Sequence, residues 1–528
     1  MEREKEEKEE EKEKPNEGHI TWRCLTRNQK EVAKRILDGN YHVAQPAGWG
    51  LLDRFFIFLK SIGFLTLLDV DGEGYVRRMI TIAKLLMTYN VKILLGIASM
   101  NQVPQTLFSD IGLLMTLGWT AEQVKNGVCN RGEGKHPGPV HKDTLSDALD
   151  RFSPSEIEHI LNEGIKLLAK KGFIKDKVFI MDATDLETTD KYEGAGCKTV
   201  KEKHVDKKGK VIEIEVTKYG FKLILLKAVE NRIVVAAKVA QIQENERNYT
   251  FPLLHQAQEN LDRKSFGLLL IDRGFLDGVD LWKIKHPFRT HFIIPAKTNM
   301  DITNDARGLR KKTGEGIYYA KGGEKGREIE VMGIEGLESY LQYGDEQHFQ
   351  EYETNRYKKD ENQGRKKFRG NALNVVMVTK WDGKEYAPGR EKVFLTTLPV
   401  SSPLEIIQKY DMRSLIENTI FRELKQGWRI NKFPKKTKNA VTAHVLLTLC
   451  MFNMTNAFRT DLGQDLTQRG IRRHRLETLS KTYGKMVIIS PPYYAIFDIE
   501  ELAILWGKPP KFLFRADPEK FKREYGLS

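Results

Sequence analysis

Two apolar runs, each followed directly by an aspartate, constrain the fold of this 528-residue chain more than any other feature. Residues 177–181 precede Asp182, and residues 268–271 precede Asp272. Short runs rich in valine, isoleucine, leucine and phenylalanine indicate buried strands. The sequence therefore predicts two carboxylates, each held at the end of a strand.

A third acidic residue, Glu417, lies in a stretch with helical character. Tyr410, Arg413 and Glu417 are three and then four residues apart. At about 100° per residue they fall within an arc of about 60° on one helix face. An arginine four residues before a glutamate is often only a surface ion pair, worth a few tenths of a kcal/mol. The alternative is a functional face that presents a carboxylate, a guanidinium and a phenol together.

The three acidic residues are candidate ligands for divalent cations. Magnesium prefers carboxylate, phosphate and water oxygens. A pair of such ions can hold both the attacking and the leaving oxygen of a phosphodiester. Two strand-end aspartates and a helical glutamate therefore indicate phosphoryl transfer on nucleic acid.

The segment after Glu417 is strongly basic. Residues 420–440 contain seven basic side chains and one acidic one, with Trp428 and Phe433 among them. The whole chain carries 86 Lys and Arg against 72 Asp and Glu, and its net charge is +14. This surplus of positive charge favours binding to a polyanion, because basic side chains that neutralise phosphates release counterions. Solubility alone is the other explanation. The candidate DNA contacts here are Arg422, Lys425, Trp428 and Arg429.

A mixed α/β fold follows from the order of periodic segments. Apolar strand candidates at 178–181, 221–229, 233–239, 268–271 and 292–295 alternate with helical patterns. This order predicts a mixed sheet flanked by helices. The apolar window 440–458 contains polar residues, so it predicts a buried helix and no membrane span.

The chain is expected to divide into six segments. We expect a disordered charged tail (1–18), a helical N-terminal DNA-binding region (19–172), a first part of a catalytic core (173–298), a β-rich insertion separate from the core sheet (299–400), a second core part with the glutamate helix (401–460) and a basic C-terminal region (461–528). For the N-terminal region, a purely packing or dimerising role is the alternative to DNA-end recognition.

The four cysteines have no C-x-x-C spacing, which argues against a disulfide framework or a structural zinc site. The N-terminus is a run of glutamate and lysine without the apolar segment of a secretory signal. We therefore expect a protein of the cytoplasm, associated with the nucleoid.

Three motifs together resemble a known family. Residues 181–184, 271–275 and 410–425 are similar to the DDE transposases of the insertion sequence four type, which carry a Tyr-Arg-Glu-Lys signature. The similarity extends from about residue 173 to residue 458. It implies an RNase H-like core in which Asp182, Asp272 and Glu417 bind two Mg²⁺ or Mn²⁺ ions. It also implies that Tyr410, Arg413 and Lys425 hold phosphates of double-stranded DNA, at transposon ends and target, in a homodimer.

One spacing departs from the signature. The family usually has six residues between its glutamate and lysine, whereas seven separate Glu417 from Lys425. On a regular helix the extra residue turns the lysine by about 100°. A one-residue π-bulge would restore the alignment, or Arg422 would take over the contact.

Other readings of the acidic residues and of the function stay open. Asp185 and Glu187 are expected in a turn after the first strand, whereas Asp277 and Asp280 are expected to cap the next helix. An RNase H-like nuclease without strand transfer would use the same three carboxylates. A domesticated protein that binds DNA without cutting it is the non-enzymatic alternative.

Overall fold

The computed structural model describes the chain in eleven stretches: residues 24–48, 50–69, 80–128, 138–205, 211–310, 317–322, 328–357, 369–413, 420–462, 485–507 and 518–527. The chain forms two compact units. One comprises Met1–Ile57, Phe64–Arg151 and Leu476–Ser528, and the other comprises Phe58–Gly63 and Phe152–Arg475. The expected boundary at residue 172 therefore lies inside the second unit, and the C-terminal segment joins the N-terminal one.

The first unit combines helices with a small sheet built from both ends of the chain. The sheet order is β1 (Thr26–Arg27), β15 (Tyr493–Asp498), β14 (Lys485–Ser490) and β2 (Val43–Pro46). Its described helices are α2 (Gln29–Leu37), α3 (Gly50–Ser61, which runs into the second unit), α4 (Ile82–Leu94), α5 (Val103–Thr106), α6 (Ile111–Thr116), α7 (Ala121–Asn126), α8 (Lys142–Asp150), α18 (Ile499–Leu505) and α19 (Pro518–Tyr525). The expectation of a helical N-terminal region is thus correct for most elements but omitted these strands.

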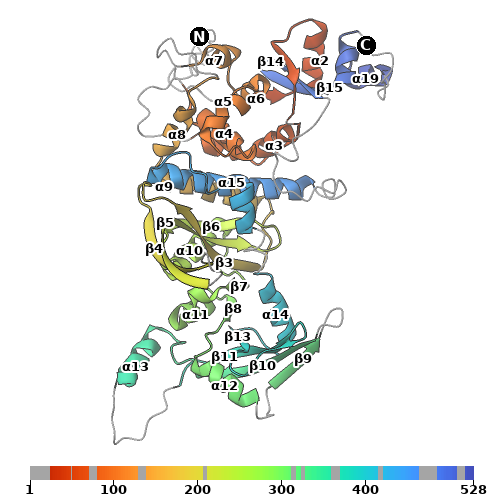
Figure 1. The fold of residues 1–528 in the computed structure, drawn as a ribbon. Coiled ribbons are helices and arrows are strands. Elements are labelled where there is room, and N and C mark those ends of the chain that lie inside the picture. The colour runs from red at the N-terminus through yellow and green to blue at the C-terminus, as the bar shows by residue number, and fades with distance from the viewer. Residues whose placement is uncertain are drawn as a thin grey trace, which may run out of the picture. The chain divides into compact units, whose positions relative to one another are not determined.

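The second unit is organised around an eleven-stranded mixed sheet (Figure 1). Its strands are β3 (Val178–Thr188), β4 (Gly196–Val205), β5 (Val211–Ala228), β6 (Val234–Gln241), β7 (Leu268–Ile271), β8 (His291–Pro295), β9 (Ile317–Gly322), β10 (Ile329–Leu337), β11 (Leu373–Trp381), β12 (Lys384–Glu385) and β13 (Lys392–Thr396). At its centre β6, β5 and β3 pair antiparallel, and β3, β7 and β8 pair parallel. This arrangement confirms the predicted RNase H-like mixed sheet.

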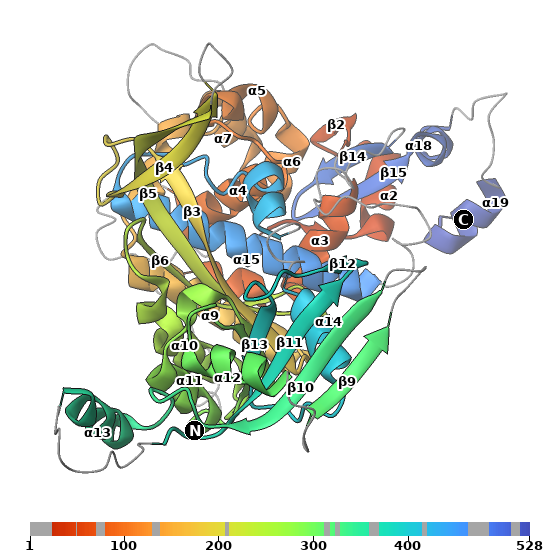
Figure 2. The ribbon, with the colours of Figure 1, turned by 60° about the horizontal axis from the view of Figure 1, so that its bottom comes forward.

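The expectation that residues 299–400 form a separate β-rich insertion is wrong. β13 pairs antiparallel with β8, with Leu395 opposite Ile294, and β11, β10 and β9 follow in the same sheet. Figure 2 shows β10 and β9 continuing the sheet beyond β11. The pairing joins residues about a hundred positions apart, so local periodicity could not reveal it. The segment also contributes α12 (Asp301–Arg310) and α13 (Glu346–Tyr357).

Helices cover the core sheet of the second unit. They include α9 (Pro154–Lys170), α10 (Thr250–Leu261), α11 (Gly278–Lys285), α14 (Pro403–Asp411) and α15 (Lys438–Leu462). α9 begins with a capping box in which Ser153 and Glu156 bond reciprocally to backbone N–H groups. α15 is long and apolar enough to cross a membrane, but its most apolar window is entirely buried. This result confirms the predicted buried helix.

The side-chain amide of Asn453, within the apolar core helix α15, hydrogen-bonds to the backbone of β6. Its side-chain nitrogen donates to the Val234 carbonyl at 2.7 Å, and its oxygen accepts from the Val234 N–H at 2.8 Å. Among the described strands, β6 pairs only with β5, so its outer edge needs other partners. Asn453 supplies them in the interior, where an unpaired backbone group is costly.

Asn453→Leu should therefore destabilise the second unit. The substitution leaves one buried N–H and one buried carbonyl without a partner, at a cost of about 2 kcal/mol or more. Chemical denaturation measures the loss. The matched control is Thr455→Val, two residues along, because the buried Thr455 hydroxyl has no hydrogen-bond partner among the described residues. If the two variants are equally stable, the amide does not stabilise this edge.

A buried lysine makes the stability of the same unit dependent on pH. Lys227 on β5 is 3% exposed. Burial, helped by the Arg232 guanidinium and partly opposed by Asp176 and Glu423, lowers the pKa of Lys227 to about 7. Between pH 7 and the ordinary lysine pKa of 10.5, the unfolded chain binds a proton that the folded chain lacks. The stability contribution of this residue therefore rises with pH across that window.

Lys227→Met should raise the unfolding midpoint, with the largest gain at pH 7 and below. The corresponding gain in the free energy of unfolding should decrease by about 1 kcal/mol per pH unit as the pH rises towards 10. Thermal unfolding of both proteins from pH 6 to pH 10 tests this expectation. A gain that is the same at every pH would show that Lys227 is not neutralised on folding.

Candidate active site

Asp182 and Asp272 lie on neighbouring strands. β3 and β7 are parallel, and Met181 on β3 is in register with Ile271 on β7. Each aspartate is the next residue along its strand direction. Because hydrogen-bonded strands lie about 4.8 Å apart, the two carboxylates are close neighbours. The prediction that each aspartate stands at the end of a strand is correct for Asp272, which directly follows β7, and wrong for Asp182, which lies within β3 because that strand continues to Thr188 by pairing with β5.

The guanidinium of Arg413 bridges the two aspartates. Its Nη1 lies 3.0 Å from Asp182 Oδ2, and its Nη2 lies 3.6 Å from Asp272 Oδ1. Asp182 also accepts a hydrogen bond from the Ala183 N–H at 2.8 Å. The Asp182 side chain is 8% exposed and the Asp272 side chain 38%, so the site opens to solvent on the Asp272 side. Arg413, which the resemblance implies holds a DNA phosphate, thus contacts two carboxylates in this structure.

Tyr410 packs beside this ion-pair cluster. It belongs to α14, and its ring lies 4.8 Å from that of Phe394 on β13. The Arg413 guanidinium carbon lies 5.8 Å from the centre of the Tyr410 ring, within the range of a cation–π contact. Burial raises the pKa of Tyr410, so its phenol stays protonated at neutral pH. Tyr410 can therefore position Arg413 and offer a hydroxyl at the edge of the site.

Glu417 lies outside the described residues, as do all of residues 414–419. Its place beside the two aspartates therefore stays a prediction. Residues 472–475, a basic run that the sequence offers as a candidate phosphate contact, also lie outside them.

A π-helical segment follows at the position of the unusual spacing. It spans Glu423–Gly427, and the Trp428 N–H donates to the Glu423 carbonyl at 2.9 Å, five residues back. A π-helical irregularity is thus present where a π-bulge was predicted. Its effect on the alignment of Glu417 with Lys425 stays a prediction.

Lys425 faces the part of β3 that follows Asp182. It lines a polar pocket of about 390 Å³. The other lining residues are Ala183, Thr184, Asp185, Glu187, Lys198, Lys222 and Glu246. Burial lowers the pKa of Lys425, and Asp185 and Glu187 partly offset the shift. The ammonium is therefore directed towards the acidic strand and not away from it.

For the neighbouring acidic residues, some of the positions predicted from the sequence are correct and others are wrong. Asp185 and Glu187 lie within β3 and not in a turn after it, because the strand continues to Thr188 by pairing with β5. Asp185 pairs with Lys198 at 2.5 Å. The cap prediction for Asp277 is confirmed, since its side chain accepts from the Val279 and Asp280 N–H groups at 3.1 Å. Burial and the Asp277 charge raise the pKa of Asp280 to about 6.

The predicted DNA contact of Trp428 is wrong. Its side chain is 2% exposed and lies edge-on to Phe452 of α15, with ring centres 5.8 Å apart. A tryptophan in a basic run can stack on a base or fill a core, and the periodicity did not distinguish the two. Arg422, by contrast, is exposed and donates to Gln426 at 3.1 Å. Arg429, in a left-handed conformation at φ 58°, remains a predicted DNA contact like Arg422.

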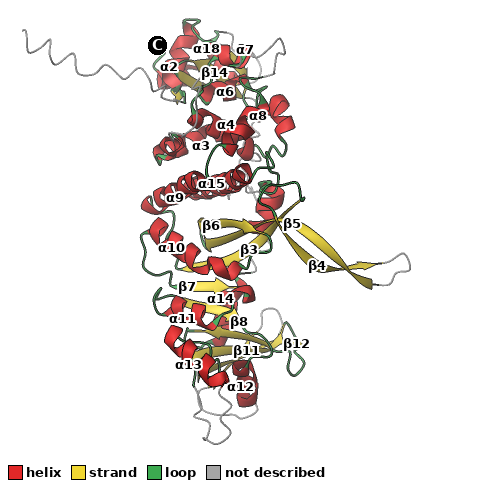
Figure 3. Ribbon diagram, turned by 90° about the vertical axis from the view of Figure 1, so that its left-hand side faces the viewer, coloured by secondary structure: helices red, strands yellow, loops and turns green. Residues whose placement is uncertain are grey.

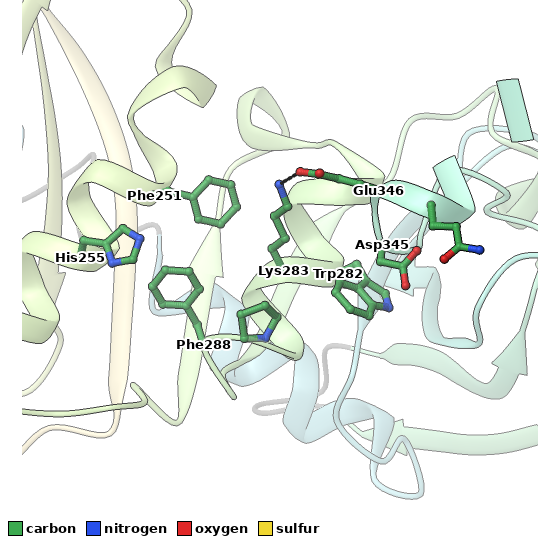
Figure 4. Close-up of a pocket in the computed structure, with 9 residues that line it drawn as sticks. Phe251, His255, Trp282, Lys283, Phe288, Asp345 and Glu346 are labelled. Carbon is green, nitrogen blue, oxygen red and sulfur yellow. Dashed lines mark hydrogen bonds and ion pairs between the residues drawn. The ribbon is translucent and has the colours of Figure 1, made fainter. Parts of the chain in front are cut away.

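A second pocket lies away from the predicted site residues (Figure 4). It has a volume of about 500 Å³ and lies between α10, α11 and the start of α13. Phe251, His255, Trp282 and Phe288 form its aromatic part, and Lys283 pairs with Glu346 at 2.6 Å on its rim. None of the residues singled out from the sequence lines it.

Comparison with known proteins gives one family. Residues 174–454 match the family described as Transposase DDE domain. No curated protein matches the chain. Among solved structures, a piggyBac transposase in a synaptic complex with hairpin DNA is similar at 10% identity and a TM-score of 0.37, covering 81% of this chain and 77% of that one. This likeness is too remote to support an argument about function.

Proposed function

Because this chain belongs to the transposase DDE domain family, we propose that it cleaves DNA at the ends of its own element and joins those ends to target DNA. The observation that supports this proposal most directly is the pair of aspartates on β3 and β7 that share one guanidinium. The assignment to the insertion sequence four type rests on the signature residues Tyr410, Arg413, Glu417 and Lys425. Such a protein would act on DNA in the cytoplasm or nucleoid, as a homodimer that holds two ends.

The donor set fits a divalent cation. Asp182 and Asp272 present carboxylate oxygens from adjacent strands, and hard cations such as Mg²⁺ and Mn²⁺ prefer such oxygens. Asp182, Asp272 and, by resemblance, Glu417 would hold the ions. When bound, the ions would supply charge stabilisation for phosphoryl transfer.

The other residues of the site would position the carboxylates and the DNA. Arg413 contacts both aspartates, so it fixes their relative orientation before substrate arrives. Tyr410 packs against Arg413 and limits its movement. Lys425 is directed at the strand segment after Asp182, where it can receive a DNA phosphate.

Two alternatives use the same residues. A nuclease would cut the DNA and release both products, and a domesticated protein would bind DNA without any cutting. The basic surplus and the intact aspartates are compatible with both. The decisive difference is whether a cleaved end is joined to a second DNA molecule.

We expect Asp182→Asn, Asp272→Asn and Glu417→Gln to abolish DNA cleavage. Each substitution removes a charged ligand while keeping the side-chain shape, and the rate should fall by about 10³-fold or more. A labelled duplex that carries the element's end, incubated with Mg²⁺ or Mn²⁺, measures cleavage. A gel-shift assay checks that each variant still binds the duplex.

The matched control is Asp277→Asn. Asp277 lies five residues after Asp272 but caps α11, and asparagine caps helices equally well. It should retain cleavage. Full activity of the Asp182 or Asp272 variant would refute the site. Joined products with a supercoiled plasmid as target would separate a transposase from a nuclease, and DNA binding without any cut product would support the binding-only alternative.

Arg413→Gln should strengthen metal binding in the absence of DNA. The guanidinium lies within ion-pair distance of both carboxylates, so its charge repels a cation and competes for the same oxygens. We expect Mn²⁺ to bind the variant about ten-fold more tightly or better, as measured by electron paramagnetic resonance. Unchanged or weaker Mn²⁺ binding by the variant would contradict this competition between the guanidinium and the ion.

A further inference from the structure

The two aspartates of the site are held in the fold by different means. Asp182 lies within β3 opposite Leu225 of β5, so strand pairing fixes the backbone on both sides of it. Asp272 follows the last residue of β7, and the pairing of β7 with β3 ends at Ile271. The Asp272 side chain is also the more exposed of the two, at 38% against 8%. The position of Asp272 therefore depends on the segment that follows it, residues 273–280.

A short turn from another part of the sheet contacts that segment. It comprises residues 242–249, between β6 and α10, and is here called the η3 turn because it ends in the 3₁₀ helix η3 (Glu246–Tyr249). The Glu244 side chain accepts from the Gln241 N–H at 2.9 Å and from the Tyr249 hydroxyl at 2.5 Å. These hydrogen bonds join the start and the end of the turn and hold it in one conformation.

Lys222 ties the η3 turn to β5. Its Nζ donates to the Glu244 carbonyl at 2.6 Å and lies 3.5 Å from Glu246 Oε2. The Lys222 side chain is only 12% exposed, so water screens this ion pair weakly. β5 lies between β6 and β3 (Figure 3), and β3 carries Asp182. The turn is thus held by the strand that pairs with the strand of the first aspartate.

Two consecutive residues of the η3 turn contact the segment after β7. The Glu246 carboxylate lies against Gly274, where an added Cβ would overlap a carboxylate oxygen and lie 3.1 Å from Glu246 Cδ. Arg247 Nη1 lies 3.0 Å from Asp277 Oδ2, and its Nε lies 3.2 Å from Asp280 Oδ2. The turn therefore contacts the segment in its middle and again where α11 begins.

We propose that Glu246 and Arg247 are positioning residues for the cation site. By holding residues 273–280 from a turn that β5 supports, they fix the place of Asp272 relative to Asp182. They act through the backbone that follows Asp272 and do not themselves bind the ion. Groups that orient metal ligands in this way contribute about 10- to 100-fold to metal affinity. The inference rests on the proposed cation site and extends it to residues outside the carboxylates.

Electrostatics alone makes the opposite prediction for Arg247. A guanidinium near a cation site repels the ion, so its removal should tighten metal binding. Loss of a positioning contact should weaken binding instead. Phe275, within the same segment, is 2% exposed, so the segment stays anchored in the core when Arg247 is replaced. The direction of the change in metal affinity therefore distinguishes the two explanations.

The first test compares Arg247→Gln with Lys283→Gln. Each substitution removes one positive charge and one partly exposed side chain that forms ion pairs, but Lys283 pairs with Glu346 of α13. Mn²⁺ is titrated into the full chain without DNA and followed by electron paramagnetic resonance. We expect Arg247→Gln to bind Mn²⁺ about ten-fold more weakly than the parent, and Lys283→Gln to bind it like the parent. The thermal unfolding midpoints of the two variants should agree.

Two further variants separate positioning from a general loss of structure. Arg247→Lys keeps the charge and can keep one of the two ion pairs, so it should restore part of the affinity. Asp277→Asn should bind Mn²⁺ like the parent, because its amide oxygen still accepts from Arg247 and Asp280 keeps its charge.

The second test leaves every charge in place. Gly274→Ala must displace the Glu246 carboxylate, so it should weaken Mn²⁺ binding about three-fold or more. In a chain that already carries Glu246→Ala, Gly274→Ala should cause no further loss, because the atoms that it displaces are gone. The control is Gly308→Ala on α12, where no atom of the described residues lies within 4 Å of the added Cβ.

The possible failures are distinct. Arg247→Gln that binds Mn²⁺ as tightly as the parent, or more tightly, overturns the inference and leaves the cation site standing. So does an equal loss from Gly274→Ala with and without Glu246. Weaker binding together with a lowered unfolding midpoint, not restored by Arg247→Lys, shows a purely structural role and also overturns it. If Asp182→Asn binds Mn²⁺ like the parent, the cation site itself is refuted, and this inference with it.

Discussion

The pairing of β3 with β7 is the constraint on which the site depends. Their parallel register sets Met181 beside Ile271, and each strand then delivers an aspartate at the next position. Two adjacent carboxylates repel each other, so the arrangement needs a neighbouring positive charge. Arg413 supplies it from the residues that follow α14, and its ion pairs connect the first and last parts of the core. The sheet creates the charge pair and the arginine stabilises it.

Long-range contacts also connect distant segments of the chain to the sheet that carries the site. Residues 299–400 continue the core sheet through β13 and β8, so they are continuous with the scaffold that carries the site. Asn453 of α15 satisfies the outer edge of β6, which links the buried helix to the opposite side of the sheet. Substitutions in either segment therefore act on the strands that hold Asp182 and Asp272.

The sequence predicted the features that local pattern determines. Apolar runs located β3 and β7 and their aspartates, and polar residues in the 440–458 window indicated a buried helix. It missed β4 because lysine, threonine and glutamate there alternate without an apolar face of their own. It misplaced residues 299–400 and Trp428 because strand pairing across a hundred residues and burial against α15 are tertiary events. The π-helical segment was predicted only because a family spacing exposed the extra residue.

The central claim is that Asp182 and Asp272 form one cation site. Crystals of the protein grown with Mn²⁺, measured at a wavelength where manganese scatters anomalously, test it most directly. The account predicts an anomalous peak within coordination distance of carboxylate oxygens from both aspartates. A peak bound to only one of them, or manganese found only elsewhere on the chain, would contradict it.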